Sequence, residues 1–99
     1  MTDQAIFAEI TNWLAKNFGT DLRKNWYVGI ASDAEKRIFE GHRVNRISGY
    51  YIYRTAINAA HARSAEAMLL RHGHDGGPGG GDETSLCVYA FRKDLGTVR

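Results

Sequence analysis

Residues 26–41 read WYVGIASDAEKRIFEG, and this stretch decides how the chain begins to fold. Its first six letters are mostly aromatic, β-branched or small apolar residues, which predicts a strand over residues 25–31. Ser32 and Glu35 then have the spacing of a capping box, in which the serine caps a helix and the glutamate returns to it. We therefore expect a strand that passes directly into a short helix over residues 33–40.

The segment before this stretch carries a helical pattern. Apolar residues recur at three- and four-residue steps through residues 3–18, which predicts an amphipathic helix that packs on the core. Thr2 or Asp3 can cap its start, and Gly19 follows its end.

Four further segments follow the short helix. Residues 42–47 are polar and basic and predict a loop, whereas the tyrosine-rich residues 49–54 predict a second strand. Residues 55–72 form the clearest helix, because they are rich in alanine and leucine. Residues 73–81 hold six glycines and a proline, which excludes regular structure there. Residues 86–92 then predict a third strand.

The expected order is therefore α-β-α-β-α-β, in a single domain that spans residues 1–99. The strands are too few and the connections too irregular for a doubly wound parallel sheet. We expect an α+β fold with a small three-stranded antiparallel sheet flanked by three helices.

Composition narrows the class of protein. A hydrophobic share of 43% with 24% charged residues excludes a disordered chain. No apolar run approaches the roughly 18 residues that cross a membrane, and the start of the chain does not resemble a signal peptide. Cys87 is the single cysteine, so an inert thiol in a reducing, cytoplasmic setting is expected. A net charge of +2 permits nucleic-acid binding without requiring it.

Glu66 is the first candidate for chemistry. On a helical wheel it is surrounded by small and aliphatic residues, namely Ala59, Ala62, Leu69 and Leu70. A carboxylate in such surroundings is costly if it is buried and unpaired. Two interpretations stay open: Glu66 binds a metal ion or forms the floor of a cleft, or it is partly exposed and pairs with Arg63.

Arg37 and Tyr27 are equally ambiguous by themselves. Arg37 lies one turn into the predicted short helix, where its planar guanidinium can bind a phosphate or simply face solvent. Tyr27 is either a core tyrosine or a phenol that faces a cleft.

Taken together, these residues resemble a known motif. The chain contains Tyr27-Val28-Gly29 and, after seven further residues, Arg37. This pattern is similar to the second half of the motif of the GIY-YIG nucleases. In that family the Tyr-[Ile/Val]-Gly strand leads into a helix with a catalytic arginine at this spacing, and a later helix supplies a catalytic glutamate. Glu66 lies in a helix of suitable position, so the resemblance extends over Trp26–Leu70.

The chain departs from the family pattern in two places. It lacks the first strand with its Gly-Ile-Tyr sequence, and it lacks the asparagine that often follows the glutamate. We expect the C-terminal strand to occupy the place of the missing strand and to supply Tyr89. Three other tyrosines are alternatives for this role: Tyr50, Tyr51 and Tyr53.

The resemblance implies hydrolysis of a phosphodiester bond by an endonuclease that acts on DNA. Glu66 would hold one divalent ion, magnesium or manganese, and Arg37 would neutralise charge on the phosphoryl oxygens. Tyr27 would activate or orient the attacking water. His42 would be a second general acid or base or a nucleic-acid contact, unless it is only a surface histidine.

Several partner predictions accompany this interpretation. Arg43, Arg46 and Arg54 alternate with tyrosines, which suits contact with nucleic acid, although a buried tyrosine face is the alternative. The glycine-rich residues 73–81 and the histidines beside them favour a flexible connector over a metal site. The small size favours a homodimer or a larger assembly. The alternative function is a catalytically inactive module that binds a nucleotide, nucleic acid or protein.

Overall fold

The computed structural model of the chain describes residues 1–19, 22–77 and 81–99. Its elements, in chain order, are α1 (Asp3–Phe18), the 3₁₀ turn η1 (Arg23–Asn25), β1 (Trp26–Ala31), α2 (Ala34–Lys36), the π-helical turn η2 (Arg37–Gly41), β2 (Tyr51–Thr55), α3 (Ala59–Arg71), β3 (Asp75–Gly76) and β4 (Cys87–Arg92). The predicted α+β class is confirmed. None of the helices in the described ranges is long and apolar enough to cross a membrane.

The strands form one four-stranded mixed sheet in the order β2-β4-β1-β3. β4 is antiparallel to both of its neighbours, whereas β3 is parallel to β1. The prediction of three antiparallel strands was therefore wrong, because Asp75 and Gly76 add a parallel strand inside the glycine-rich segment. Side-chain composition does not predict this strand, because its pairing with β1 depends on a close approach of the two backbones. A Cβ at Gly76 would lie only 2.7 Å from the carbonyl oxygen of Val28. The last part of the predicted connector, residues 78–80, lies outside the described residues.

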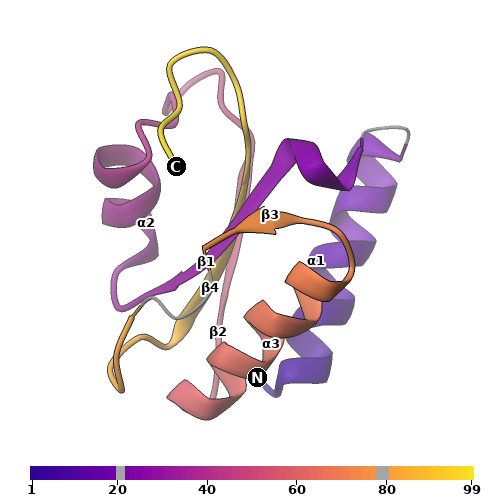
Figure 1. Cartoon of the computed structure of the whole chain (residues 1–99), viewed down its shortest axis with the longest axis vertical. Helices are drawn as coiled ribbons and strands as arrows, with labels where there is room; N and C mark the ends of the chain where they lie inside the picture. The colour runs from indigo at the N-terminus through magenta and orange to yellow at the C-terminus, as the bar shows by residue number, and fades with distance from the viewer. Residues whose placement is uncertain (20–21, 78–80) are drawn as a thin grey trace.

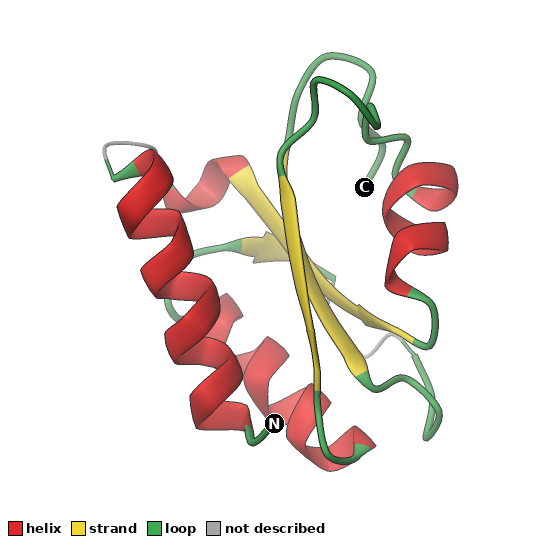
Figure 2. Cartoon of the chain, turned by 180° about the vertical axis from the view of Figure 1, so that it is seen from behind, coloured by secondary structure: helices red, strands yellow, loops and turns green. Residues whose placement is uncertain are grey.

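Helices cover the two faces of the sheet unequally. α1 and α3 lie side by side on one face, and α2 lies alone on the other (Figures 1 and 2). Side chains alternate along β1, so that Trp26, Val28 and Ile30 pack against α1 and α3. Tyr27 and Ala31 instead join the smaller cluster beneath α2.

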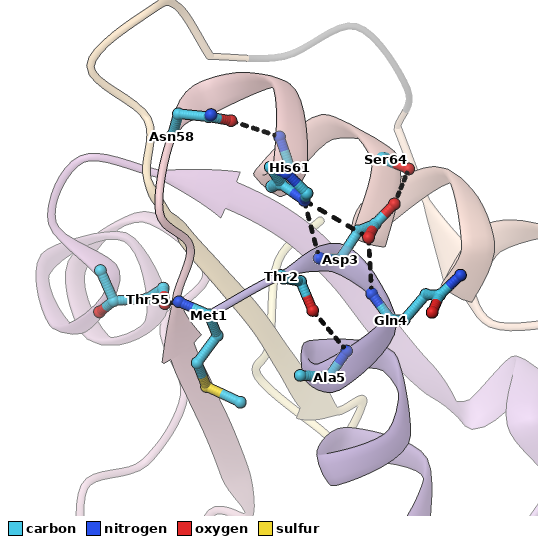
Figure 3. A network of polar contacts seen from close by, with 9 residues as sticks. All are labelled: Met1, Thr2, Asp3, Gln4, Ala5, Thr55, Asn58, His61 and Ser64. Atoms are coloured by element: carbon cyan, nitrogen blue, oxygen red, sulfur yellow. Dashed lines mark hydrogen bonds and ion pairs between the residues drawn. The ribbon is translucent and has the colours of Figure 1, made fainter.

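The start of the chain connects α1 to the rest of the fold (Figure 3). Thr2 caps α1, which decides between the two candidates, Thr2 and Asp3, that the sequence offered. The Ser64 hydroxyl donates to the Asp3 carboxylate over 2.6 Å, and the Asp3 backbone N–H donates to Nδ1 of His61 over 3.0 Å. The amino group of Met1 donates to a carbonyl at the end of β2 over 3.1 Å. These contacts hold α1 against α3 and against the edge of the sheet.

The cap of α2 and the start of α3 differ from the prediction. Asp33, and not Ser32, caps α2, because the helix begins one residue later than expected and the Asp33 carboxylate accepts from the backbone N–H of Lys36 over 3.1 Å. Glu35 accepts from Tyr53 over 2.9 Å instead of returning to the cap. α3 starts later than the predicted residue 55, because β2 continues to that position and Asn58 provides the cap.

Candidate functional site

Gly29 allows two strands to share one site. In the antiparallel pairing of β1 with β4, Gly29 lies opposite Tyr89. The Tyr89 ring crosses the space where a side chain would stand, since a Cβ at Gly29 would lie 2.5 Å from the Tyr89 hydroxyl oxygen. The glycine is therefore required for this close approach. The predicted neighbourhood of β1 and the C-terminal strand is present in the sheet, with β4 between β1 and β2.

The Tyr89 hydroxyl contacts a buried histidine. Its oxygen lies 2.7 Å from Nε2 of His42, while Nδ1 of His42 lies 2.6 Å from the carbonyl oxygen of Val98. A carbonyl oxygen only accepts, so Nδ1 carries the proton and Nε2 of the neutral ring accepts from the phenol. His42 and Tyr89 are 5% and 1% exposed, so the interpretation of His42 as a surface histidine was wrong.

A π-helical turn brings Arg37 to the same place. The backbone N–H of His42 donates to the carbonyl of Arg37 over 2.8 Å, which closes η2. Side chains five residues apart on an α-helix would point about 140° away from each other, whereas a π turn brings them onto one side. The turn brings the Arg37 charge near the Tyr89 phenol, where it opposes the rise in the Tyr89 pKa. The sequence contains no signal for this turn, and π turns are common at functional sites.

The surroundings set the protonation of these groups. Burial raises the pKa of Tyr89 above its usual range, against the opposing charge of Arg37. Burial also lowers the pKa of His42, and the Arg37 charge lowers it further, whereas the hydrogen bond to Val98 opposes this. At neutral pH the phenol is therefore protonated and the imidazole is neutral, which is the arrangement that the hydrogen-bond directions require. Because Tyr89 is protonated and donates to His42, it is a poor candidate for a base.

Tyr27 is the more accessible phenol. It is half-buried, its ring stacks on Phe91 with the centroids 5.3 Å apart, and its ring centroid lies 4.9 Å from that of His42. Its hydroxyl extends towards the end of β3, where a Cβ at Gly77 would lie 3.4 Å from the phenol oxygen. Tyr27 thus joins the cluster of Arg37, His42 and Tyr89 but keeps contact with solvent.

Glu66 projects from α3 among buried small and aliphatic residues, as the wheel predicted, and it is 5% exposed. Burial raises the pKa of Glu66, and the nearby charge of Arg63 opposes the shift. Within residues 1–19, 22–77 and 81–99, no hydrogen bond or ion pair to the Glu66 carboxylate is found. Its charge also raises the pKa of Tyr89, which connects Glu66 electrostatically to the cluster on the other face of the sheet.

Glu66 is the side chain that the predicted metal ion would use. Mg²⁺ keeps several waters and binds proteins through one or two carboxylates, and Glu66 would offer one of them. In that same part of the chain, no group of three or more His, Cys, Asp or Glu side chains could hold a metal ion. In particular, His74 donates from Nδ1 to the carbonyl of Leu69 over 2.9 Å, and Asp75 pairs with Lys93.

Two hollows flank the cluster. One, of about 450 Å³, lies along α2, and Arg37 is among its lining residues with Ser32 and Lys36. The other, of about 520 Å³, lies beside β3, and its lining includes Lys24, Lys93 and Arg99. The sequence analysis missed this second hollow, because its cations are far apart in the chain. They meet only because β1 pairs with β4, as the hydrogen bond from Lys93 N–H to the Asn25 carbonyl shows (2.8 Å).

The three arginines predicted to bind nucleic acid do not form one surface. Arg54 pairs with Glu9 of α1 over 2.8 Å, so it lies on the face of the sheet opposite α2. The Arg46 guanidinium covers the ring of Phe39 at 4.2 Å from its centroid. Arg43 is exposed and lines a separate hollow with the segment after β4. The structure brings none of the three into contact with Tyr89.

Asp3, His61 and Ser64 include the residue types of a catalytic triad, but their contacts do not suit one (Figure 3). The serine hydroxyl donates to the carboxylate, and Nδ1 of the histidine accepts from a backbone N–H. A triad requires the histidine to accept from the serine. The group is therefore a structural link between α1 and α3.

Comparisons with protein-family models, with curated proteins and with solved structures found no match for this chain. The GIY-YIG resemblance therefore stays a prediction. The α2 face offers a guanidinium, an accessible phenol and a neutral imidazole, and the carboxylate of Glu66 on α3 acts on this group through its charge.

Proposed function

We propose that this protein is a divalent-metal-dependent endonuclease of the GIY-YIG type that hydrolyses phosphodiester bonds in DNA. One observation carries the proposal. Tyr27, His42 and Tyr89 form one contacting cluster on the α2 face of the sheet, the Arg37 backbone is bonded to His42, and the charges of Arg37 and of the buried Glu66 act on Tyr89. The sequence motif and the helical wheel select these residues from the sequence alone, so their proximity in the structure is an independent argument for a shared role.

Each side chain has a role that follows from its surroundings. Arg37 is exposed along the hollow beside α2, where it can neutralise charge that develops on the phosphoryl oxygens. Tyr27 orients the attacking water, because its hydroxyl is the accessible phenol of the cluster. Tyr89 and His42 are positioning residues for these two groups.

Glu66 is the residue that would hold the metal ion. When bound, a magnesium or manganese ion stabilises negative charge on the scissile phosphate and on the leaving oxygen.

The basic hollow beside β3 suits the phosphates that flank the scissile bond. Lys93 and Arg99 are held by Asp75, over 2.9 and 3.2 Å, and Lys24 adds a further cation. Each phosphate contact releases counterions, so DNA affinity is expected to fall as salt rises. Removing Lys24 and Lys93 together should reduce the slope of log affinity against log salt by about 2.

A plasmid-nicking assay in Mg²⁺ or Mn²⁺ tests the proposal. We expect Glu66→Ala and Arg37→Ala to lower the nicking rate at least about 100-fold, since each removes stabilisation of transition-state charge. Glu83→Ala, a change of an exposed acid outside the cluster, is the matched control and should keep the rate. A wild-type protein that nicks no DNA or RNA substrate with either metal, or a Glu66→Ala variant that nicks normally, would contradict the proposal.

The second candidate is a non-catalytic module that keeps the nucleic-acid surface. The burial of Tyr89 and His42 favours it, because neither group can touch a substrate directly without rearrangement. This candidate predicts salt-dependent DNA binding that is the same in wild type and Glu66→Ala, without cleavage in either.

A further inference from the structure

The segment after β4 turns back onto the face of the sheet that carries the cluster. A turn closes between Asp94 and Thr97, with the Thr97 N–H donating to the Asp94 carbonyl over 3.1 Å and the Asp94 N–H donating to the Thr97 hydroxyl over 3.1 Å. Gly96 has a φ of +92°, a conformation that favours glycine. The end of the chain consequently lies on the α2 side of the sheet (Figures 1 and 2).

This turn places the backbone of Val98 against His42. The Val98 N–H donates to the His42 carbonyl over 2.7 Å, and the Val98 carbonyl accepts from Nδ1 of the His42 ring over 2.6 Å. The Val98 side chain takes no part, and the residue is 45% exposed. One residue thus binds both the main chain and the ring of a buried histidine.

The contact decides which nitrogen of the ring carries the proton. A neutral imidazole can be protonated on either nitrogen, and the partner of one nitrogen sets the state of the other. With the proton on Nδ1, the ring donates to the Val98 carbonyl and accepts from the Tyr89 hydroxyl. With the proton on Nε2, the Nδ1 lone pair would face the Val98 carbonyl oxygen at 2.6 Å without a hydrogen.

We propose that Val98 is a positioning residue whose backbone carbonyl holds His42 in the Nδ1-protonated tautomer and thereby orients the Tyr89 hydroxyl. The segment that follows the last strand is then a part of the site. The effect on activity rests on the proposed nuclease function, whereas the effect on the tautomer does not.

Long-range ¹H–¹⁵N correlation spectra of the histidine rings test the tautomer directly. In the wild-type protein at neutral pH, His42 should show a protonated Nδ1 and an unprotonated Nε2. Val98→Pro lacks the N–H that anchors the segment and should lose this preference. Val98→Ala keeps both backbone groups and should retain it. Thr97→Val removes the hydroxyl of the turn and should weaken the preference in the same direction without a proline.

Two results would overturn the proposal: a wild-type His42 protonated on Nε2, or a fully retained Nδ1 preference in both Val98→Pro and Thr97→Val. If the protein nicks DNA, Val98→Pro should lower kcat about tenfold with little change in KM, and Val98→Ala should not. If the tautomer changes as expected and no variant or wild type cleaves, the nuclease function fails while the positioning role of Val98 stands.

Discussion

The two faces of the sheet are built from different chemistry. The face under α1 and α3 is packed through apolar contacts: Ile6, Ile10, Val28, Leu69 and Val88 are all fully buried there, and aromatic rings such as that of Trp26 pack beside them. The face under α2 holds aromatic rings joined by polar contacts, as in the chain of hydrogen bonds from Tyr89 through His42 to Val98. Both faces bury their residues, yet only the second depends on the direction of individual bonds.

The two faces therefore contribute differently to the stability of the fold and to the chemistry of the candidate site. Aliphatic packing is non-directional and tolerates small shifts at a modest loss, whereas a hydrogen-bonded cluster works only if each donor meets its acceptor. Changes on the α1/α3 face should therefore alter the free energy of unfolding most, and changes on the α2 face should alter the site beyond their effect on stability.

The largest expected effect on the free energy of unfolding comes from the face under α1 and α3. Ile10→Ala removes a fully buried side chain and should lower the free energy of unfolding by about 2–5 kcal/mol, through lost burial and the cavity left behind. Urea unfolding followed by circular dichroism measures the change. Leu95→Ala, at a fully exposed position, is the control and should stay within about 0.5 kcal/mol of wild type. Equal effects of the two changes would contradict the assigned core.

Gly29→Ala tests the close approach between β1 and Tyr89. The new methyl group would meet the Tyr89 oxygen at 2.5 Å and its Cζ at 2.6 Å, so the buried ring must move. We expect a loss of about 1–3 kcal/mol in the free energy of unfolding. The same substitution in a Tyr89→Ala background should cost much less, since the ring is gone. An unchanged cost in that background would show that the strain lies elsewhere.

Tyr89→Phe isolates one hydrogen bond of the α2 face. It keeps the ring and leaves Nε2 of the buried His42 without its donor, which should lower stability by about 1–2 kcal/mol. Tyr53→Phe is the matched control, because its bond to Glu35 is exposed and should contribute at most about 0.5 kcal/mol. Thermal unfolding of the two variants compares them. A larger loss in Tyr53→Phe would reverse the proposed roles of the two tyrosines.

The smallest expected effect is an increase, and not a decrease, in the free energy of unfolding. Burial raises the pKa of Glu66 above its ordinary 4.5. The protonated Glu66 therefore contributes its full stabilisation below pH 4.5, and this stabilisation is lost as the pH rises through the raised pKa of the folded state. Glu66→Gln should remove this loss and stabilise the protein by about 1 kcal/mol at pH 8. Unfolding curves between pH 4 and pH 8 should show little difference at the acidic end. Destabilisation at pH 8 would argue for a structural ion pair at Glu66.

Part of the site could be predicted from the sequence because its signals are local. The strand that contains Tyr27 and Gly29 and the helical surroundings of Glu66 follow from residue patterns within single elements. The α+β class follows for the same reason. The family resemblance of these residues and the role of Tyr89 as a substitute tyrosine remain proposals, which the nicking assay tests.

Other features are decided by groups that are distant along the chain or by the backbone alone. β3 exists because Gly76 lets its backbone pair with β1, although its composition predicts a connector. His42 is buried because a π turn rotates it towards Tyr89 and because Val98 returns to meet it. Lys24, Lys93 and Arg99 share a hollow only through strand pairing. Local side-chain patterns determine which elements form, whereas the pairing of backbone groups far apart in sequence determines which side chains meet.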